Sequence, residues 1–174
     1  FKQKTAYEIG VRLVGSEMCI RDRAQACLTF EQWAARVLPE KPLSTAPPRD
    51  IVLHHGHCHQ KALIGTDSTL DVIRKAGGEA RDLDAGCCGM AGSFGYQRDH
   101  LAVSLAIGER ALAPAVRQHS GPVVAPGFSC RHQIAGLSRR PALHVIQLLD
   151  EVLGGGGAES AESAQNKAAA GAFY

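Results

Sequence analysis

The sequence predicts an α/β fold, in which a small parallel sheet is flanked by helices and cysteines lie on loops at the carboxyl edge of the strands. Two observations support this class. From residue 49 onward, short apolar segments typical of strands alternate with helical segments, which is the pattern of a parallel, right-handed layer structure. The 174 residues are 45% hydrophobic and 21% charged, which suits one globular domain with a substantial core.

The elements of the first half follow from apolar spacing and from turn residues. Apolar positions at helical spacing predict an amphipathic helix over residues 24–38, and the prolines of residues 39–48 predict a linker. The apolar run at 51–54 predicts a strand. A second helix is expected over 68–76, where Gly77 and the glycine after it would end it.

The second half continues the alternation. Residues 79–83 predict a weaker strand, and residues 100–112 predict a helix with leucines on one face. Pro114 is expected to end or kink that helix. A third strand is expected over 122–125, and a last helix over 145–153.

Four segments organise the chain. Residues 1–23 resemble translated sequencing-adaptor sequence and are interpreted as non-native, with an ordinary N-terminal helix as the alternative; Cys19 then has no function. Residues 24–48 form the helix and proline-rich linker, and residues 49–153 form the cysteine-rich domain. The glycine- and alanine-rich tail, residues 154–174, is predicted to be disordered.

Charge, hydropathy and cysteine content argue against several classes of protein. Residues 1–23 hold five basic residues against three acidic ones, and the remainder holds fourteen of each sign, so no basic footprint for nucleic acid is present. No apolar run of about 18 residues predicts a transmembrane helix, and no signal segment is recognised. Six sparse cysteines do not fit a secreted disulfide scaffold. A cytoplasmic location is expected, with a peripheral position at the inner face of the membrane as an extension of it.

Four cysteines are the candidate metal ligands. Cys58, the adjacent pair Cys87 and Cys88, and Cys130 each follow a predicted strand. Because parallel strands end at the same edge of a sheet, these thiols are expected to converge there. Soft thiolates suit an iron–sulfur cluster or a zinc ion. Cys27, on a predicted helix, is expected to be a packing residue.

Glycines surround these cysteines. Gly86, Gly89, Gly92 and Gly127 are the candidate cofactor-binding residues, because they let the backbone approach a cluster and direct N–H groups towards sulfur. The flanking basic side chains would stabilise negative charge at the site or simply form hydrogen bonds within their loops. These side chains are His54, His55, His57, His59, Lys61, Arg131 and His132.

Two alternatives to an iron–sulfur cluster stay open. Zinc needs four tetrahedral ligands, which the four cysteines supply in number, although adjacent residues on one small ion would be strained. A metal-free thiol pair formed by Cys87 and Cys88, with a resolving partner, would perform redox exchange but leave Cys58 and Cys130 unexplained.

The segments around these cysteines resemble the cysteine-rich domain named for its Cys-Cys-Gly motif, over about residues 49–150. That domain occurs in heterodisulfide reductase, in glycolate oxidase iron–sulfur subunits and in the membrane-linking subunit of anaerobic glycerol-3-phosphate dehydrogenase. The resemblance is greatest to the C-terminal part of bacterial FAD-linked oxidases fused to iron–sulfur domains, of the D-2-hydroxyglutarate or D-lactate dehydrogenase type. The heterodisulfide-reductase motif has a fifth cysteine where this chain has Gln133, so disulfide-cleaving chemistry is not expected.

The resemblance implies a fragment of an oxidoreductase. Its four thiolates match a four-iron, four-sulfur (4Fe-4S) cubane that carries electrons from flavin to a quinone or another acceptor. FAD and ferredoxin-like clusters are expected only in upstream domains of a parent chain, because no flavin or nicotinamide fingerprint is present here. The chain alone would bind a cluster without turning over substrate. The alternative is a zinc-bound or metal-free docking domain of a redox complex.

Overall fold

The computed structural model describes residues 14–43 and 49–154. Its centre is a three-stranded parallel sheet in the order β2-β1-β3. The strands are β1 (Arg49–His54), β2 (Gly78–Asp82) and β3 (Val123–Val124). The predicted α/β class with a small parallel sheet is therefore confirmed, and all three strands lie within two residues of their expected positions.

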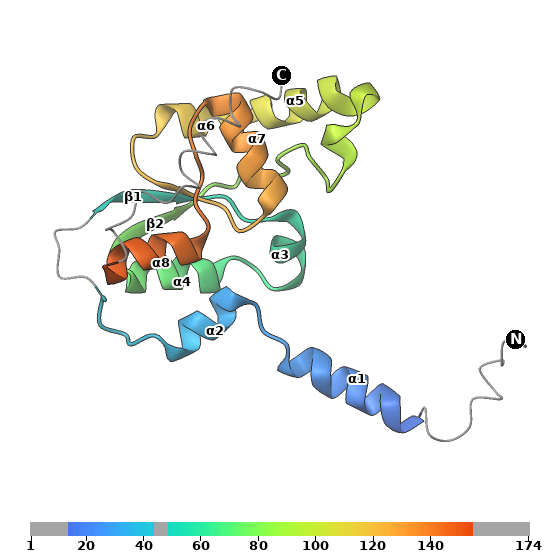
Figure 1. Cartoon of the computed structure of the whole chain (residues 1–174), viewed down its shortest axis with the longest axis vertical. Coiled ribbons are helices and arrows are strands. Elements are labelled where there is room, and N and C mark those ends of the chain that lie inside the picture. The colour runs from blue at the N-terminus through green and yellow to red at the C-terminus, as the bar shows by residue number, and fades with distance from the viewer. Residues whose placement is uncertain (1–13, 44–48, 155–174) are drawn as a thin grey trace, which may run out of the picture.

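Helices cover both faces of the sheet (Figure 1). On one face lie α4 (Asp67–Lys75) and α8 (Val145–Leu153), and on the other lie α6 (Leu112–Gln118) and α7 (Phe128–Ser138). The helix predicted over 145–153 has the bounds expected. This three-layer arrangement is the usual way to bury both faces of a parallel sheet.

Two apolar clusters fill the space between the layers. Val52 of β1 belongs to the cluster beneath α4 and α8, whereas its neighbour Leu53 belongs to the cluster beneath α6 and α7. The period of two along a strand explains this division, because successive side chains point to opposite faces. The second cluster comprises Leu53, Cys88, Met90, Leu112, Val116, Val123, Ala125, Cys130 and Ile134. Two of the candidate ligands are therefore part of the core.

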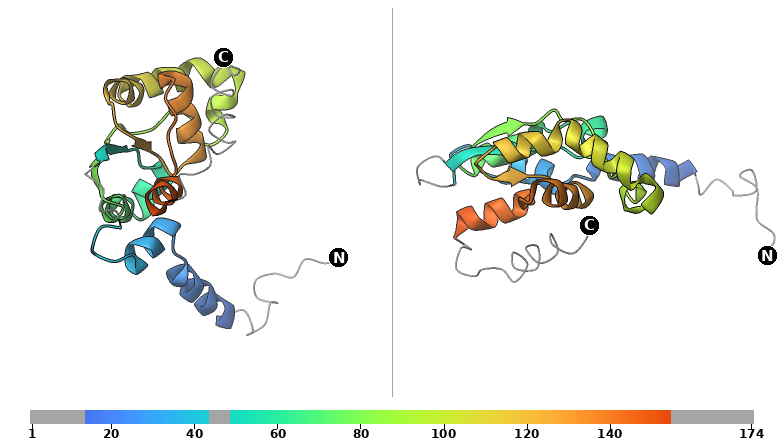
Figure 2. Two further views of the ribbon diagram at one scale, coloured as in Figure 1. Left: turned by 60° about the vertical axis from the view of Figure 1, so that its left-hand side comes forward. Right: turned by 90° about the horizontal axis from the view of Figure 1, so that it is seen from above.

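The predicted helix over 24–38 is wrong in its bounds. The chain instead forms α1 (Val14–Ala26) and α2 (Phe30–Val37), separated by a break. Thr29 causes the break, because its hydroxyl accepts from the backbone N–H of Gln32, and the Gln32 side chain accepts from the Thr29 N–H in a capping box. Figure 2 shows α1 extending away from the layered body.

The predicted helix over 100–112 is also corrected. It forms α5 (Leu101–Arg110), and the helical path breaks at Ala111 before α6 begins. Pro114, expected to end or kink the helix, lies in the first turn of α6. Proline fits there because N–H groups in the first turn have no partner within the helix.

Five elements of the structure were not predicted. They are α3 (Cys58–Leu63), α6, α7, and the short 3₁₀ turns η1 (Phe94–Tyr96) and η2 (Arg98–His100). The interpretations of the linker and the C-terminal tail fall largely on residues 44–48 and 155–174, outside the described ranges. No helix within the described ranges is both long and apolar enough to cross a membrane.

The N-terminus of α8 depends on a neutral histidine. His144 Nδ1 accepts from the backbone N–H of Ile146 at 3.2 Å, and the Gln147 side chain accepts from the His144 backbone N–H at 2.7 Å. Burial lowers the pKa of His144, although nearby Glu31 opposes the shift. The folded state therefore binds this proton more weakly than the unfolded state, whose histidine has a pKa of about 6.5.

We predict that the His144 contribution to the free energy of unfolding is complete above about pH 6.5 and declines as pH falls towards the lowered pKa of the folded state. His144→Asn keeps a capping side chain without titrating in this range, so its stability should vary less between about pH 7.5 and 5.5. Urea unfolding of both proteins across this range, followed by circular dichroism, measures the difference. Parallel pH profiles would contradict the prediction.

Candidate metal centre

The carboxyl edge of the sheet brings three distant segments together. The backbone N–H of His55, just beyond β1, donates to the carbonyl of Val124 in β3 at 2.9 Å. On the other side of β1, Leu83 donates to the carbonyl of His54 at 2.7 Å. These hydrogen bonds extend the pairing past the strand ends, so the segments that carry the cysteines leave the sheet side by side.

The four predicted cysteines reach this edge from different local structures. Cys87 and Cys88 lie on the loop after β2, as expected. Cys58 is the first residue of α3, and Cys130 is the third residue of α7. Cys27 is exposed in the break between α1 and α2.

A buried cluster of donors forms the inner part of the candidate centre. His55, Cys88 and Cys130 are all buried, and one donor atom from each lies within 4.8 Å of the others. The two sulfurs are 3.5 Å apart and both cysteines are free. An imidazole nitrogen and two thiols at this spacing are able to hold a metal ion.

The other two cysteines form an outer pair. Cys58 and Cys87 are both half-buried. Burial raises the pKa of Cys58, and a hydrogen bond with Cys87 raises it further. Cys87 also accepts from the backbone N–H of Gly89 at 3.3 Å. The adjacent cysteines thus belong to different pairs, one inner and one outer.

Cys88 and Cys130, which form the inner pair, have pKa values shifted in opposite directions, so Cys88 is the one that carries the negative charge. The hydrogen bond from Cys130 lowers the pKa of Cys88 to about 4, and the neighbouring His55 also favours its charged form. The same Cys88 contact, reinforced by burial, strongly raises the pKa of Cys130. Metal binding would need to release this second proton, because a thiolate is the ligand.

The predicted glycines have different surroundings. Gly86, Gly89 and Gly92 all have positive φ, which favours glycine. A Cβ on Gly89 would lie 2.2 Å from the carbonyl oxygen of Ser104, whereas one on Gly86 or Gly92 would meet nothing within 4 Å. At Gly127 a Cβ would lie 3.0 Å from the Cys130 sulfur. Of these four predicted glycines, Gly89 and Gly127 are therefore the two that close packing requires.

Gln133 has a structural position where the resembling motif has a cysteine. Its side chain is fully buried, and its amide donates to the carbonyl and the hydroxyl of Ser104 at 3.1 and 3.2 Å. Ser104 of α5 is the residue against which Gly89 packs. Gln133 thus connects α7 to α5 at Ser104, the same residue that the Cys-Cys-Gly loop contacts through Gly89.

Two of the flanking basic residues bind backbone carbonyls near the centre. Lys61 Nζ donates to the carbonyl of Gly86 at 3.0 Å, which connects α3 to the cysteine loop. The guanidinium of Arg131 donates to the carbonyls of Ala125 and Pro126 at 3.0 and 2.8 Å, which fixes the turn between β3 and α7. Both side chains therefore position ligand-bearing segments.

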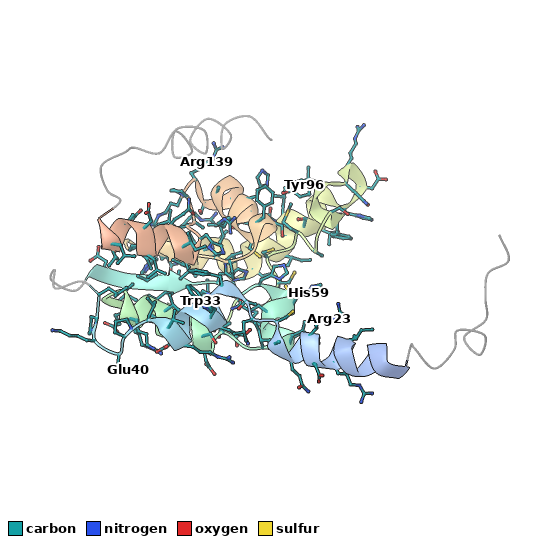
Figure 3. All side chains as sticks on the ribbon, turned by 60° about the horizontal axis from the view of Figure 1, so that its bottom comes forward. Arg23, Trp33, Glu40, His59, Tyr96 and Arg139 are labelled. Carbon is teal, nitrogen blue, oxygen red and sulfur yellow. The ribbon has the colours of Figure 1, made fainter. Side chains whose placement is uncertain are left out.

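The histidines divide by orientation. His54 Nδ1 contacts Asp82 at 2.9 Å on the sheet, and His57 and His59 meet edge to face near the start of α3. His59 is exposed, and Figure 3 shows its position at the surface.

His55 is the functional candidate that the sequence analysis did not select as a ligand. Alternation along β1 would have indicated it, because His55 falls on the same face as Leu53 and hence on the side of Cys88 and Cys130.

Comparisons with known proteins give relatives that are named as dehydrogenases. The chain is 28% identical over 163 residues to D-2-hydroxyglutarate dehydrogenase of Escherichia coli (strain K12), covering 84% of this chain and 16% of the relative. It is 35% identical over 123 residues to a subunit of anaerobic glycerol-3-phosphate dehydrogenase from the same strain, covering 68% of this chain and 29% of the relative. D-2-hydroxyglutarate dehydrogenase of Pseudomonas putida (strain KT2440) is 28% identical over 121 residues, which are 68% of this chain and 12% of the relative.

The chain thus spans less than a third of the length of these relatives. No protein-family model and no solved structure matches it. Its similarity is to segments of two kinds of dehydrogenase, and the activities of those proteins belong to much longer chains.

The close approach of Gly89 to Ser104 provides a test of the loop. We predict that Gly89→Ala lowers the free energy of unfolding by about 3 kcal/mol, because a side chain there has unfavourable φ and also overlaps a backbone carbonyl. Urea unfolding of the reduced, metal-free chain measures this loss.

Gly86→Ala is the matched control. It has positive φ but open space around the new Cβ, so only the conformational cost of about 1 kcal/mol is expected. Equal losses for the two variants would show that the packing against Ser104 does not hold the loop.

Proposed function

We propose that residues 49–153 form an iron–sulfur electron-transfer domain, with a 4Fe-4S cluster bound by Cys58, Cys87, Cys88 and Cys130. The observation that carries the proposal is the meeting of four thiols and a buried imidazole at one sheet edge, although three separate segments supply them. When bound, the cluster would supply one-electron transfer. Thiolate ligands presented from loops and helix starts suit such a cluster.

The residues of this chain would bind and shield the cluster. Burial of Cys88 and Cys130 keeps water away from the inner side. The N–H of Gly89 donates to the Cys87 sulfur, and such donors raise the reduction potential of a cluster. Lys61 adds positive charge close to Cys58, which also favours the reduced state.

The relatives support a place for this domain in a longer dehydrogenase. Under this proposal the parent protein oxidises a 2-hydroxy acid with FAD in an upstream domain, and electrons pass through ferredoxin-like clusters to a quinone or another acceptor. The chain described here would take part in electron transfer and would not bind the substrate. A quinone acceptor would favour a cytoplasmic protein at the inner face of the membrane.

One observation favours a second candidate, a zinc-stabilised docking domain. Tetrahedral zinc with bonds of about 2.3 Å to sulfur separates two thiolates by about 3.8 Å. The Cys88 and Cys130 sulfurs are 3.5 Å apart, which is near that spacing. A cubane takes each thiolate on a different iron, so its binding would require these two side chains to move apart.

The metal content of the full 174-residue chain distinguishes the two functions. We predict that the protein purified without oxygen contains about four irons with acid-labile sulfide, and that dithionite reduction produces an electron paramagnetic resonance signal. Cys88→Ser should lose most of the iron, because this residue is central to the buried donors.

Cys27→Ser is the matched control, since Cys27 is exposed and contributes nothing to the centre; its iron content should equal that of the wild type. One zinc per chain without iron or sulfide would replace the electron-transfer proposal by the docking alternative.

A further inference from the structure

His55 is buried without the hydrogen bonds that a buried imidazole needs. Its exposed fraction is 0%, and neither ring nitrogen has an oxygen or nitrogen partner within the described part of the chain, so that the Cys88 thiol is the polar group with which the ring interacts. Other histidines among the described residues leave one buried nitrogen without such a partner, whereas His55 leaves both. Because buried polar groups are normally satisfied, this imidazole indicates a missing partner.

The environment of His55 identifies the chemistry of that partner. A ring nitrogen of His55 lies within 4.8 Å of the sulfurs of Cys88 and Cys130, which are themselves 3.5 Å apart. Three donors of these types around one point match the ligands of a borderline-soft metal ion. The backbone of His55 is fixed by its hydrogen bond to Val124, which keeps the residue at the carboxyl edge of the sheet.

The neighbouring histidines do not offer this arrangement. His54 points to the opposite face and contacts Asp82. His57 is only partly buried, and His59 is exposed. His55 alone among these four combines complete burial with proximity to the inner cysteine pair.

We propose that His55 is a direct ligand of the metal centre beside Cys88 and Cys130. In a 4Fe-4S cluster, where each iron takes one protein ligand, its imidazole nitrogen would stand in place of one thiolate of the outer pair, Cys58 or Cys87. The proposal rests on the proposed function only in requiring a metal at this edge. A neutral nitrogen in place of a thiolate lowers the negative charge of the centre, and imidazole ligation raises the potential of iron–sulfur centres. The ligand set is therefore mixed rather than all cysteine.

Selective isotope labelling tests this ligation in the wild-type protein. The full chain is produced with ¹⁵N-histidine, purified without oxygen and reduced, and pulsed electron paramagnetic resonance measures nitrogen coupling to the metal. We expect a strong coupling that changes from the ¹⁴N to the ¹⁵N pattern with the label. Bound iron without strong histidine coupling would overturn the proposal.

Two variants assign the signal to one residue. His55→Gln should lose the histidine coupling, and His55→Cys should retain metal through a thiolate while losing the coupling and shifting the potential downwards. His59→Gln is the matched control, because His59 is exposed on the neighbouring helix and should leave the coupling unchanged. Coupling that persists in both His55 variants would refute the assignment.

A separate titration distinguishes failure of this proposal from failure of the iron–sulfur function. If the purified chain lacks iron, Co²⁺ is added to the metal-free protein, and the thiolate charge-transfer bands and ¹⁵N-histidine coupling are recorded. Cobalt bound with histidine coupling would support His55 ligation while contradicting the iron–sulfur cluster. Cobalt bound without that coupling, or no binding of either metal, would overturn the His55 proposal.

Discussion

The parallel pairing at the end of the central strand is the constraint on which the candidate centre depends. His54 pairs with Asp82 of β2 and with Val124 of β3, so the three strands end level with one another. Only with this register do the segments after each strand start from one edge. The donors are then brought together by the backbone pairing of the strands and by the contacts of Cys88 with Cys130 and of Cys58 with Cys87.

A second layer of contacts holds the loop that carries the adjacent cysteines. Gly89 packs on the backbone of Ser104, and Gln133 donates to the same residue from α7. Helices α5 and α7 therefore pack against the loop at Gly89, and Lys61 of α3 contacts the same loop through the carbonyl of Gly86. With a glutamine in this position the segment after Cys130 contributes packing, and the candidate donors at this edge are four thiols and one imidazole.

The sequence predicted the sheet and its carboxyl edge because short apolar segments alternate with helical segments along the chain. This alternation is visible without knowledge of contacts between distant residues. The sequence also identified all four cysteines, although the ligand roles assigned to them stay predictions. It missed the start of α3 at Cys58 and α7 around Cys130, because short helices after a strand lack a long apolar period. It also did not select His55, whose significance depends on burial and on contacts with residues more than thirty positions away.

The separation of Cys87 from Cys88 bears directly on what the centre is able to do. Had both thiols faced one small ion, the short link between them would have strained its geometry. Instead Cys88 faces the core with Cys130, and Cys87 lies half-buried beside Cys58. An electron carrier needs a shielded interior to set its potential and a side near the surface for exchange with a partner. The inner and outer pairs provide these two environments, which a purely structural metal site buried on all sides does not require.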